Sequence, residues 1–124
     1  MYLKPRYNPK LQRSRSKYGN KKTTIHGITF DSKWESERYL YLKSLEKAGR
    51  IKDLELQPRY NILVNDQKIC AYVADFKYNK ENADGIWEHI VEDAKGVETP
   101  EFKLKKKLMK AVFDIDIYLS KKNS

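Results

Sequence analysis

Two aspartates and one lysine stand out because they lie in segments that are typical of β-strands, where charged side chains are uncommon. Asp75 interrupts the apolar segment 69–78, ICAYVADFKY. A carboxylate inside a buried strand is costly unless a metal ion, an ion pair or solvent at a strand end compensates it. We therefore treat Asp75 as a candidate functional residue. A structural ion pair, or a position at a frayed strand end, is the alternative.

The segment 86–95, IWEHIVEDAK, carries the second aspartate and the lysine. Alternation along a strand places Asp93 and Lys95 on one face and turns Glu92 to the other. Carboxylates from neighbouring strands, Asp75 and Asp93, can converge on one hard cation such as Mg²⁺, which prefers oxygen ligands. Lys95 beside them would orient or activate an attacking water, or stabilise charge developing on a phosphate. The expected chemistry is metal-dependent hydrolysis of a phosphodiester.

The elements that would position these residues follow from apolar periodicity and from capping signals. They predict a mixed α/β domain with the order helix, three strands as a meander, helix, strand. In chain order the expected elements are a β-hairpin turning at His26-Gly27 within 23–30, a helix at 32–48, strands at 53–64, 69–78 and 86–95, a helix at 100–113, and a strand at 115–119 packed beside the sheet.

Both helices have clear termini in the sequence. Ser32 and Glu35 have the spacing of a capping box, and Gly49 is a natural stop. Thr99 is expected to cap the second helix, with Pro100 at its first position. The side chains expected to face the core are Trp34, Tyr41, Leu42, Leu45 and Ala48 in the first helix, Trp87 in the third strand, and Phe102, Met109, Val112 and Phe113 in the second helix.

Basic residues are concentrated at the N-terminus. Residues 1–30 contain eight of the 26 Lys and Arg residues and none of the 17 Asp and Glu residues. We expect a flexible basic arm over 1–22 that binds DNA, since Lys and Arg gain affinity by releasing counterions from phosphates; a solvated tail is the alternative. The DNA-contacting candidates are Lys4, Arg6, Lys10, Arg13, Arg15, Lys17, Lys21 and Lys22 of this arm, with Lys103 and Lys106 of the second helix.

Composition excludes several classes of protein. The 124 residues suit one domain, expected at 23–124 behind the arm, and no apolar run is long enough to span a membrane. No secretory signal is expected, and Cys70, the only cysteine, cannot form an internal disulfide. A free thiol suits the reducing cytoplasm. Two histidines and one cysteine cannot supply a structural zinc site.

The pattern of Asp75 followed by Asp93-Ala94-Lys95 resembles the signature of the PD-(D/E)xK nuclease superfamily, with Ala74 in place of the first proline. The predicted element order matches the restriction-endonuclease-like core of that superfamily. Over residues 18–113 the chain also resembles an uncharacterised family found largely in bacteriophages and prophages. The segments that carry this likeness are GITFDSKWESERY (27–39), LELQPRYNI (54–62), YVADFKY (72–78), VEDAKGVET (91–99) and FKLKKKLM (102–109).

The same motifs are similar to those of the cleaving subunit of some transposases and, more distantly, of archaeal Holliday junction resolvases. The resemblance implies an endonuclease that uses Mg²⁺ or Mn²⁺ to cleave DNA, including branched DNA, in phage or prophage DNA metabolism in the bacterial cytoplasm. A homodimer is expected by analogy with small resolvases. The alternative is a non-catalytic DNA- or RNA-binding accessory protein with the same fold.

The resemblance also assigns two residues that spacing alone does not. It makes Glu35 the third carboxylate of the metal site with Asp75 and Asp93, whereas the helix pattern does not choose between Glu35 and Glu37. Completion of the capping box is the other role open to Glu35. The resemblance places Gln57 beside the site in a supporting role, and a surface glutamine is the alternative.

Overall fold

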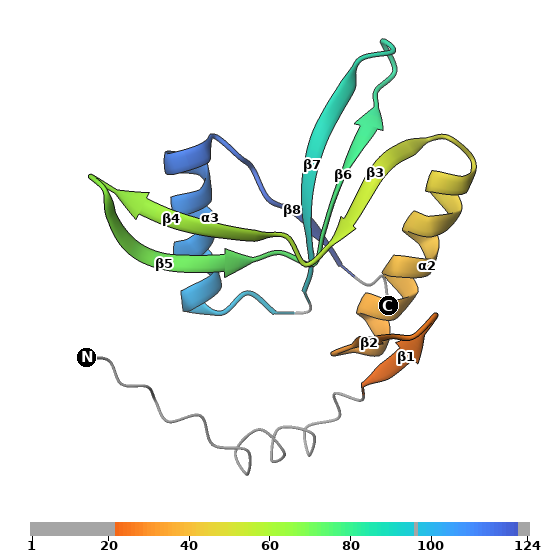
Figure 1. Cartoon of the computed structure of the whole chain (residues 1–124), viewed down its shortest axis with the longest axis horizontal. Helices are drawn as coiled ribbons and strands as arrows, with labels where there is room; N and C mark the ends of the chain where they lie inside the picture. The colour runs from red at the N-terminus through yellow and green to blue at the C-terminus, as the bar shows by residue number, and fades with distance from the viewer. Residues whose placement is uncertain (1–21, 96, 122–124) are drawn as a thin grey trace. The chain divides into compact units, whose positions relative to one another are not determined.

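The computed structural model describes residues 22–95 and 97–121 (Figure 1). The chain divides into two units, residues 1–37 and 38–124. The first contains a hairpin of β1, Thr23–Ile25, and β2, Ile28–Phe30. His26 and Gly27 form its turn with φ of 53° and 78°, the positive angles of a tight hairpin turn. The predicted hairpin is therefore confirmed.

Helix α2, Lys33–Lys47, begins in the first unit and continues into the second. Its capping signals are confirmed: the Ser32 hydroxyl accepts the backbone N–H of Glu35 at 3.1 Å, and Gly49 ends the helix with φ of 80°. Leu42 is buried, but Tyr41, expected to face the core, is 51% exposed. The Tyr41 ring instead lies under the guanidinium of Arg38, whose Cζ is 5.0 Å from the Tyr41 ring centroid.

The second unit contains a four-stranded mixed sheet, so the mixed α+β class is confirmed. Its strands, in spatial order, are β3 (Ile51–Leu56), β6 (Phe76–Glu81), β7 (Trp87–Ala94) and β8 (Tyr118–Ser120). The first two pairs are antiparallel and the last is parallel. Helix α3, Pro100–Phe113, carries the chain back between β7 and β8, as a parallel pair requires.

The last strand differs from its prediction. It was expected at 115–119 beside the sheet, but β8 pairs within the sheet, with Tyr118 opposite Glu92 and Ser120 opposite Ala94. The cause is Asp114, which ends α3 in the left-handed conformation with φ of 58°. The chain therefore turns sharply at the helix end and has three residues in which to reach the edge of β7.

Of the three other predicted strands, 86–95 is one strand, β7, and two are each divided in two. The segment 53–64 becomes β3 and β4, Arg59–Val64, and the segment 69–78 becomes β5, Gln67–Val73, and β6. Strands β4 and β5 pair only with each other, so 69–78 is not one central strand. One face of this hairpin consequently stays open, and Ile69 and Val73 are about half exposed.

The break between β3 and β4 and the break between β5 and β6 lie opposite each other in the hairpin. Gln57 has a positive φ of 53°, and Pro58 has no N–H to donate to a ladder. Opposite them, the Ala74 N–H donates to the Pro58 carbonyl at 3.1 Å, and the Gln57 N–H donates to the Asp75 carbonyl at 3.0 Å. The long hairpin thus stays connected across the break but bends from one sheet into the other.

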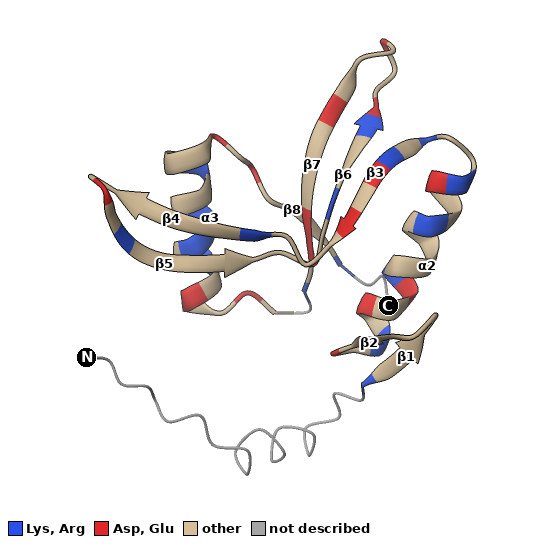
Figure 2. Ribbon diagram, viewed as in Figure 1, with Lys and Arg blue, Asp and Glu red and all other residues tan. Residues whose placement is uncertain are grey.

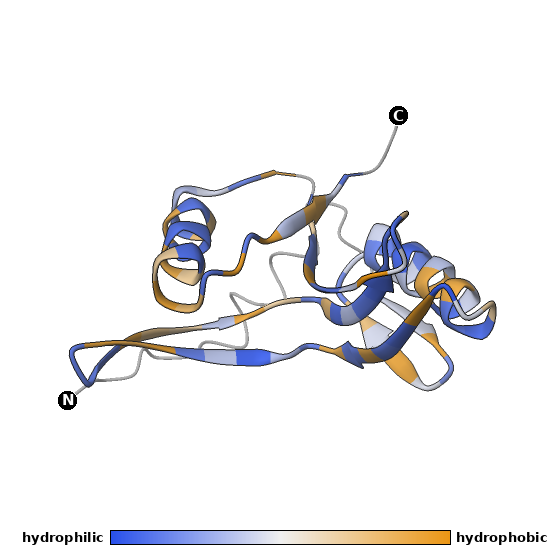
Figure 3. Ribbon diagram, turned by 90° about the horizontal axis from the view of Figure 1, so that it is seen from above, coloured by the Kyte–Doolittle hydropathy of each residue, from blue (hydrophilic) through white to orange (hydrophobic). Residues whose placement is uncertain are grey.

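Helix α3 covers the β4–β5 hairpin, as the view from above shows (Figure 3). The predicted cap is confirmed, because the Thr99 hydroxyl accepts the Phe102 N–H at 3.1 Å. Val112 and Phe113 were expected to face inward but are 37% and 38% exposed. The buried cluster that joins α3 to the strands consists of Ile62, Tyr72, Ala74, Val91, Phe102, Met109 and Ile117.

The prediction that Trp87 is a core residue is wrong. Trp87 is 38% exposed and lies at the start of β7, opposite Glu81 at the end of β6. The Lys52 ammonium lies against its ring, 4.2 Å from the Trp87 ring centroid. None of the helices among the described residues is long and apolar enough to cross a lipid bilayer.

A buried ion pair fixes the second unit's part of α2 to the sheet. Glu92 of β7 is completely buried and accepts hydrogen bonds from Nε and Nη2 of Arg38. The Tyr78 hydroxyl of β6 donates to the same carboxylate at 2.6 Å. Burial, and then the hydrogen bond to Glu92, raise the pKa of Tyr78. One carboxylate therefore joins α2, β6 and β7.

Replacing Arg38 tests this pair. Arg38→Met retains an unbranched side chain but leaves Glu92 buried without its counter-charge, so we expect the free energy of unfolding to fall by about 3–5 kcal/mol. The double variant Arg38→Met/Glu92→Met should regain most of that loss, because no buried charge remains. Urea unfolding followed by circular dichroism measures both. A double variant no more stable than the single one would contradict this account.

Candidate functional site

Asp75 lies at the break between β5 and β6. Its side-chain Oδ2 accepts the backbone N–H of Ala94 at 2.7 Å, and its own N–H donates to the Glu92 carbonyl at 3.1 Å. The carboxylate is therefore directed at the C-terminal end of β7. A strand end bonded to the backbone explains how a half-buried aspartate is accommodated in an apolar segment.

Asp93 lies on β7 and is 2% exposed. Its Oδ2 accepts the Tyr72 hydroxyl at 2.5 Å, and its Oδ1 lies 3.2 Å from the Lys95 ammonium. Glu92 makes its contacts with Arg38 and Tyr78 instead. The predicted alternation is thus confirmed, with Asp93 and Lys95 on one side of the strand.

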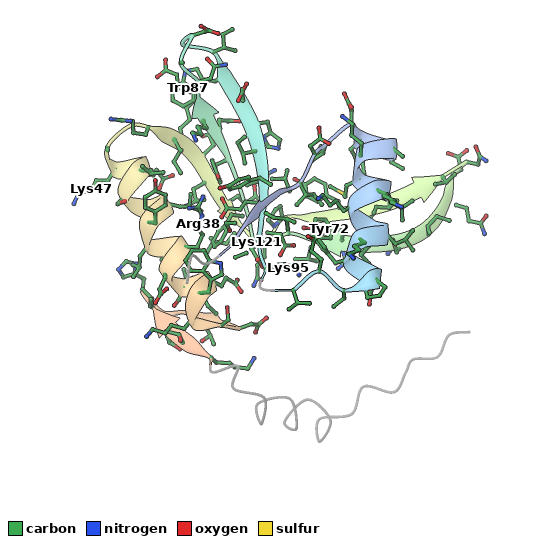
Figure 4. All side chains as sticks on the ribbon, turned by 180° about the vertical axis from the view of Figure 1, so that it is seen from behind. Arg38, Lys47, Tyr72, Trp87, Lys95 and Lys121 are labelled. Atoms are coloured by element: carbon green, nitrogen blue, oxygen red, sulfur yellow. The ribbon has the colours of Figure 1, made fainter. Side chains whose placement is uncertain are left out.

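Lys95 and Tyr72 lie where the sheet meets α3 (Figure 4). The Lys95 ammonium is 4.8 Å from the ring centroid of Phe102, the first buried residue of α3. The Tyr72 and Phe102 ring centroids are 6.3 Å apart. The first turn of α3 therefore borders the Asp93–Lys95 pair, and the lysine can reach solvent because its side chain is 31% exposed.

Tyr72 is the residue that connects the two aspartates. Burial raises the pKa of Tyr72 most, followed by the charge and hydrogen bond of Asp93, and then by the charge of Asp75. Asp93 therefore bonds the buried Tyr72 hydroxyl directly, and the charge of Asp75 only adds to the cost of ionising it. Tyr72 was not among the residues predicted for the site, although a tyrosine three residues before Asp75 in an apolar segment needs a partner for its hydroxyl.

Gln57 and Glu35 differ in what the structure says of them. The Gln57 backbone is hydrogen-bonded to Asp75, but its side chain is exposed. Glu35 lies in the first turn of α2, is 7% exposed, and belongs to the first unit of the chain. Its membership in a metal site with Asp75 and Asp93 stays a prediction. Among residues 22–95 and 97–121, no group of three or more His, Cys, Asp or Glu is arranged to hold a metal ion.

The predicted DNA-contacting residues fall into three groups. Lys103 and Lys106 come together along one groove beside α3. Lys22 is exposed and lies 3.2 Å from Asp31. The remaining arm residues, Lys4, Arg6, Lys10, Arg13, Arg15, Lys17 and Lys21, lie outside the described residues.

A family model, Protein of unknown function (DUF1064), matches residues 15–122, which is most of the chain. The chain belongs to this family. No curated protein and no solved structure matches the chain. The DUF1064 match includes the two aspartates, Tyr72 and Lys95, and its description names no activity. The function is therefore argued from the chemistry of this site.

The two buried tyrosines predict how stability depends on pH. Tyr72 and Tyr78 are each 4% exposed, and both pKa values are raised above the ordinary value of 10.0. Above pH 10 the unfolded chain loses these protons while the folded chain retains them. The free energy of unfolding should therefore fall with rising pH, by about 1.4 kcal/mol per pH unit for each tyrosine.

Urea unfolding at a series of alkaline pH values measures this fall, and the ultraviolet absorbance of tyrosinate reports ionisation. Tyr72→Phe/Tyr78→Phe should flatten the dependence, whereas Tyr41→Phe, at an exposed tyrosine, should leave it unchanged. Ionisation of Tyr72 or Tyr78 near pH 10 in the folded protein would show that their environment does not favour the neutral form.

Proposed function

We propose that this protein is a metal-dependent endonuclease that cleaves DNA phosphodiester bonds. The observation that carries the proposal is the Asp93 carboxylate, bonded to the Tyr72 hydroxyl and paired with Lys95, at the end of the strand whose Ala94 N–H binds Asp75. Acidic side chains from neighbouring segments beside a partly exposed lysine are the groups that phosphodiester hydrolysis with a bound cation requires.

The topology gives independent support for a restriction-endonuclease-like core. In chain order, α2 is followed by three antiparallel strands of the main sheet, by α3, and by β8 parallel to β7. This is the order expected from the resemblance to PD-(D/E)xK nucleases. Asp75, just before β6, and Asp93, near the end of β7, are the acidic residues of the motif, and their place at neighbouring strand ends supports the proposal.

The residues of the cluster fit a hard cation by their donor chemistry. Asp75 and Asp93 would hold Mg²⁺ or Mn²⁺ through carboxylate oxygens, with Glu35 as the third ligand that the resemblance implies. When bound, the cation would polarise the phosphodiester and neutralise the charge that develops on it. Asp93 contacts Lys95 through Oδ1, so the partly exposed lysine would have to leave that oxygen for a cation to bind it.

The protein's own groups would then divide the remaining work. Tyr72 fixes the orientation of Asp93 by donating its hydroxyl to Oδ2, and the first turn of α3 shields this hydrogen bond from water. The Lys95 ammonium would orient the attacking water and stabilise negative charge on the phosphate. The Ala94 N–H holds Asp75 in place through Oδ2.

The partner and setting belong to the same proposal. The basic arm at 1–22 would hold the DNA backbone, and a domain this small would bind a duplex as a homodimer. We place the activity in the bacterial cytoplasm, in phage or prophage DNA metabolism, with branched DNA among its substrates.

One observation favours a second candidate, a non-catalytic DNA- or RNA-binding module. Both side-chain oxygens of Asp93 already have partners within the protein, Tyr72 and Lys95. An ion pair of this kind can be purely structural. Metal-dependent cleavage therefore decides between the two functions.

Substitutions at Asp93 and Lys95 test the nuclease. Asp93→Asn should abolish cleavage but keep or tighten DNA binding, because a negative charge that repels phosphate is removed. Lys95→Ala should lower the cleavage rate about 10²–10³-fold, as removal of a preorganised positive group does elsewhere. Asp84→Asn, in the exposed β6–β7 turn, makes the same charge change and should leave the rate unaltered.

Labelled duplex, flap, four-way and single-stranded DNAs with Mg²⁺ or Mn²⁺ provide the readout. Folded wild-type protein that binds DNA but cleaves none of these substrates would refute the nuclease and leave the binding module.

Deletion of residues 1–22 tests the arm. If about six of the arm's eight basic residues meet phosphates, the DNA affinity of the full chain should fall roughly 10³-fold between about 50 and about 200 mM salt. The truncated chain should lose this salt dependence. Fluorescence anisotropy of a labelled duplex over a salt series measures the slope. A truncated chain with the wild-type slope would show that the arm does not contact the backbone.

A further inference from the structure

Helix α3 carries a stripe of lysines that lines a groove of about 360 Å³. The lysines recur every three or four residues, so they share one side of the helix. The other walls come from Glu98, which precedes α3, and Asp116, which follows it. The lysines of the stripe, referred to below as the α3 groove lysines, are Lys103, Lys106, Lys107 and Lys110. Figure 2 shows basic positions along α3.

The charges in this groove are only partly compensated. Lys110 lies 2.9 Å from Asp114 and 3.1 Å from Asp116. Glu98 lies 3.7 Å from Lys121, which is not part of the groove. Within the described part of the chain, Lys103, Lys106 and Lys107 form no ion pair with Asp or Glu. Three lysines of the stripe therefore keep an uncompensated charge, and their apolar stems form much of the groove wall.

Such an arrangement costs the helix some stability. Like charges three or four residues apart repel each other and destabilise a helix by a few tenths of a kcal/mol for each pair. An anion in the groove would offset this repulsion. The acidic side chains at the two ends confine the positive charge to the middle of the stripe, between Lys103 and Lys107.

The groove starts beside the candidate site. Phe102, whose ring contacts Tyr72 and the Lys95 ammonium, directly precedes Lys103. From Lys103 to Lys107 the helix rises about 6 Å. Phosphates of one DNA strand are about 3.4 Å apart along the duplex axis, so this length matches about two spacings, or about three phosphates. The stripe thus runs from the site over a few nucleotides.

We propose that this groove binds the phosphodiester backbone of the DNA strand that enters the candidate site, with Lys103, Lys106 and Lys107 on successive phosphates. The inference rests on the proposed function for the identity of the anion as DNA. It adds Lys107 to the contacts and gives the strand a direction along α3. Because only phosphates are contacted, binding in the groove is independent of base sequence.

Salt-dependent binding by the full chain tests the groove. The groove variant is Lys103→Gln/Lys106→Gln/Lys107→Gln. A matched control, Lys43→Gln/Lys68→Gln/Lys105→Gln, removes the same charge from residues outside the groove; Lys105 is on α3 itself, 3.1 Å from Glu101. Binding of a labelled DNA duplex is measured by anisotropy over a salt series. A chelator removes divalent metal, so the duplex stays intact and the readout does not depend on cleavage.

We expect the groove variant to lower the slope of log affinity against log salt by about two to three, since each phosphate contact contributes about 0.9. The control should change it by less than one. The single variant Lys107→Gln, at an exposed position, should lower the slope by about one and tests the groove even if the triple variant folds poorly. Equal slopes for the groove and control variants, or a wild-type slope for Lys107→Gln, would overturn the proposal.

The result separates the groove from the nuclease. A groove variant that loses affinity while wild-type protein cleaves no DNA refutes the activity and supports the groove as a DNA-binding surface. Wild-type protein that cleaves DNA, with a groove variant of unchanged KM and slope, refutes the groove alone. A duplex RNA of the same length is the competitor, and tighter binding of RNA at the groove would overturn the assignment to DNA.

Discussion

Two hydrogen bonds at the break in the long hairpin determine where both sheets end. They join Gln57 to Asp75 and Pro58 to Ala74, at a level where one strand has a positive φ and a residue without an N–H. The ladder cannot continue straight through such a point. The β4–β5 hairpin consequently leaves the main sheet and packs on α3, and Asp75 is left at the junction with its carboxylate on the end of β7. The position of the candidate site is a consequence of this bend.

Strand β7 then separates two charged neighbours with different roles. Glu92 faces α2 and is completely buried. Its partners are Arg38 of that helix and Tyr78 of β6. Asp93 faces α3, where its partners are Tyr72 and a lysine that retains contact with solvent. A charge that is fully paired in the interior stabilises one arrangement of the elements, whereas a charge with a movable partner can exchange it for another cation. Alternation along β7 therefore places Glu92, which stabilises the fold, and Asp93, which belongs to the candidate site, on opposite faces of the same strand.

The sequence predicted the features that depend on neighbouring residues. Helix caps at Ser32 and Thr99, and the shared side of Asp93 and Lys95, follow from spacings of two or three positions. It failed where burial or pairing depends on distant parts of the chain. Trp87 is exposed at the start of β7, where Lys52 of β3 lies against its ring, and the break at Asp75 is set by Gln57 and Pro58 between β3 and β4. Tyr72 was missed for the same reason, since its importance lies in a contact with a residue 21 positions away.

The parallel pairing of β7 with β8 has a consequence for how the domain comes together during synthesis. Asp93 lies opposite Leu119, so one side of its strand stays unpaired until the chain has been made past α3 and residues 118–120. Until then, β7 is an open sheet edge, a state in which strands can pair with other chains. A nascent or truncated chain would therefore hold its acidic cluster on an unfinished edge, and Asp93 gains its final setting only as the last strand docks.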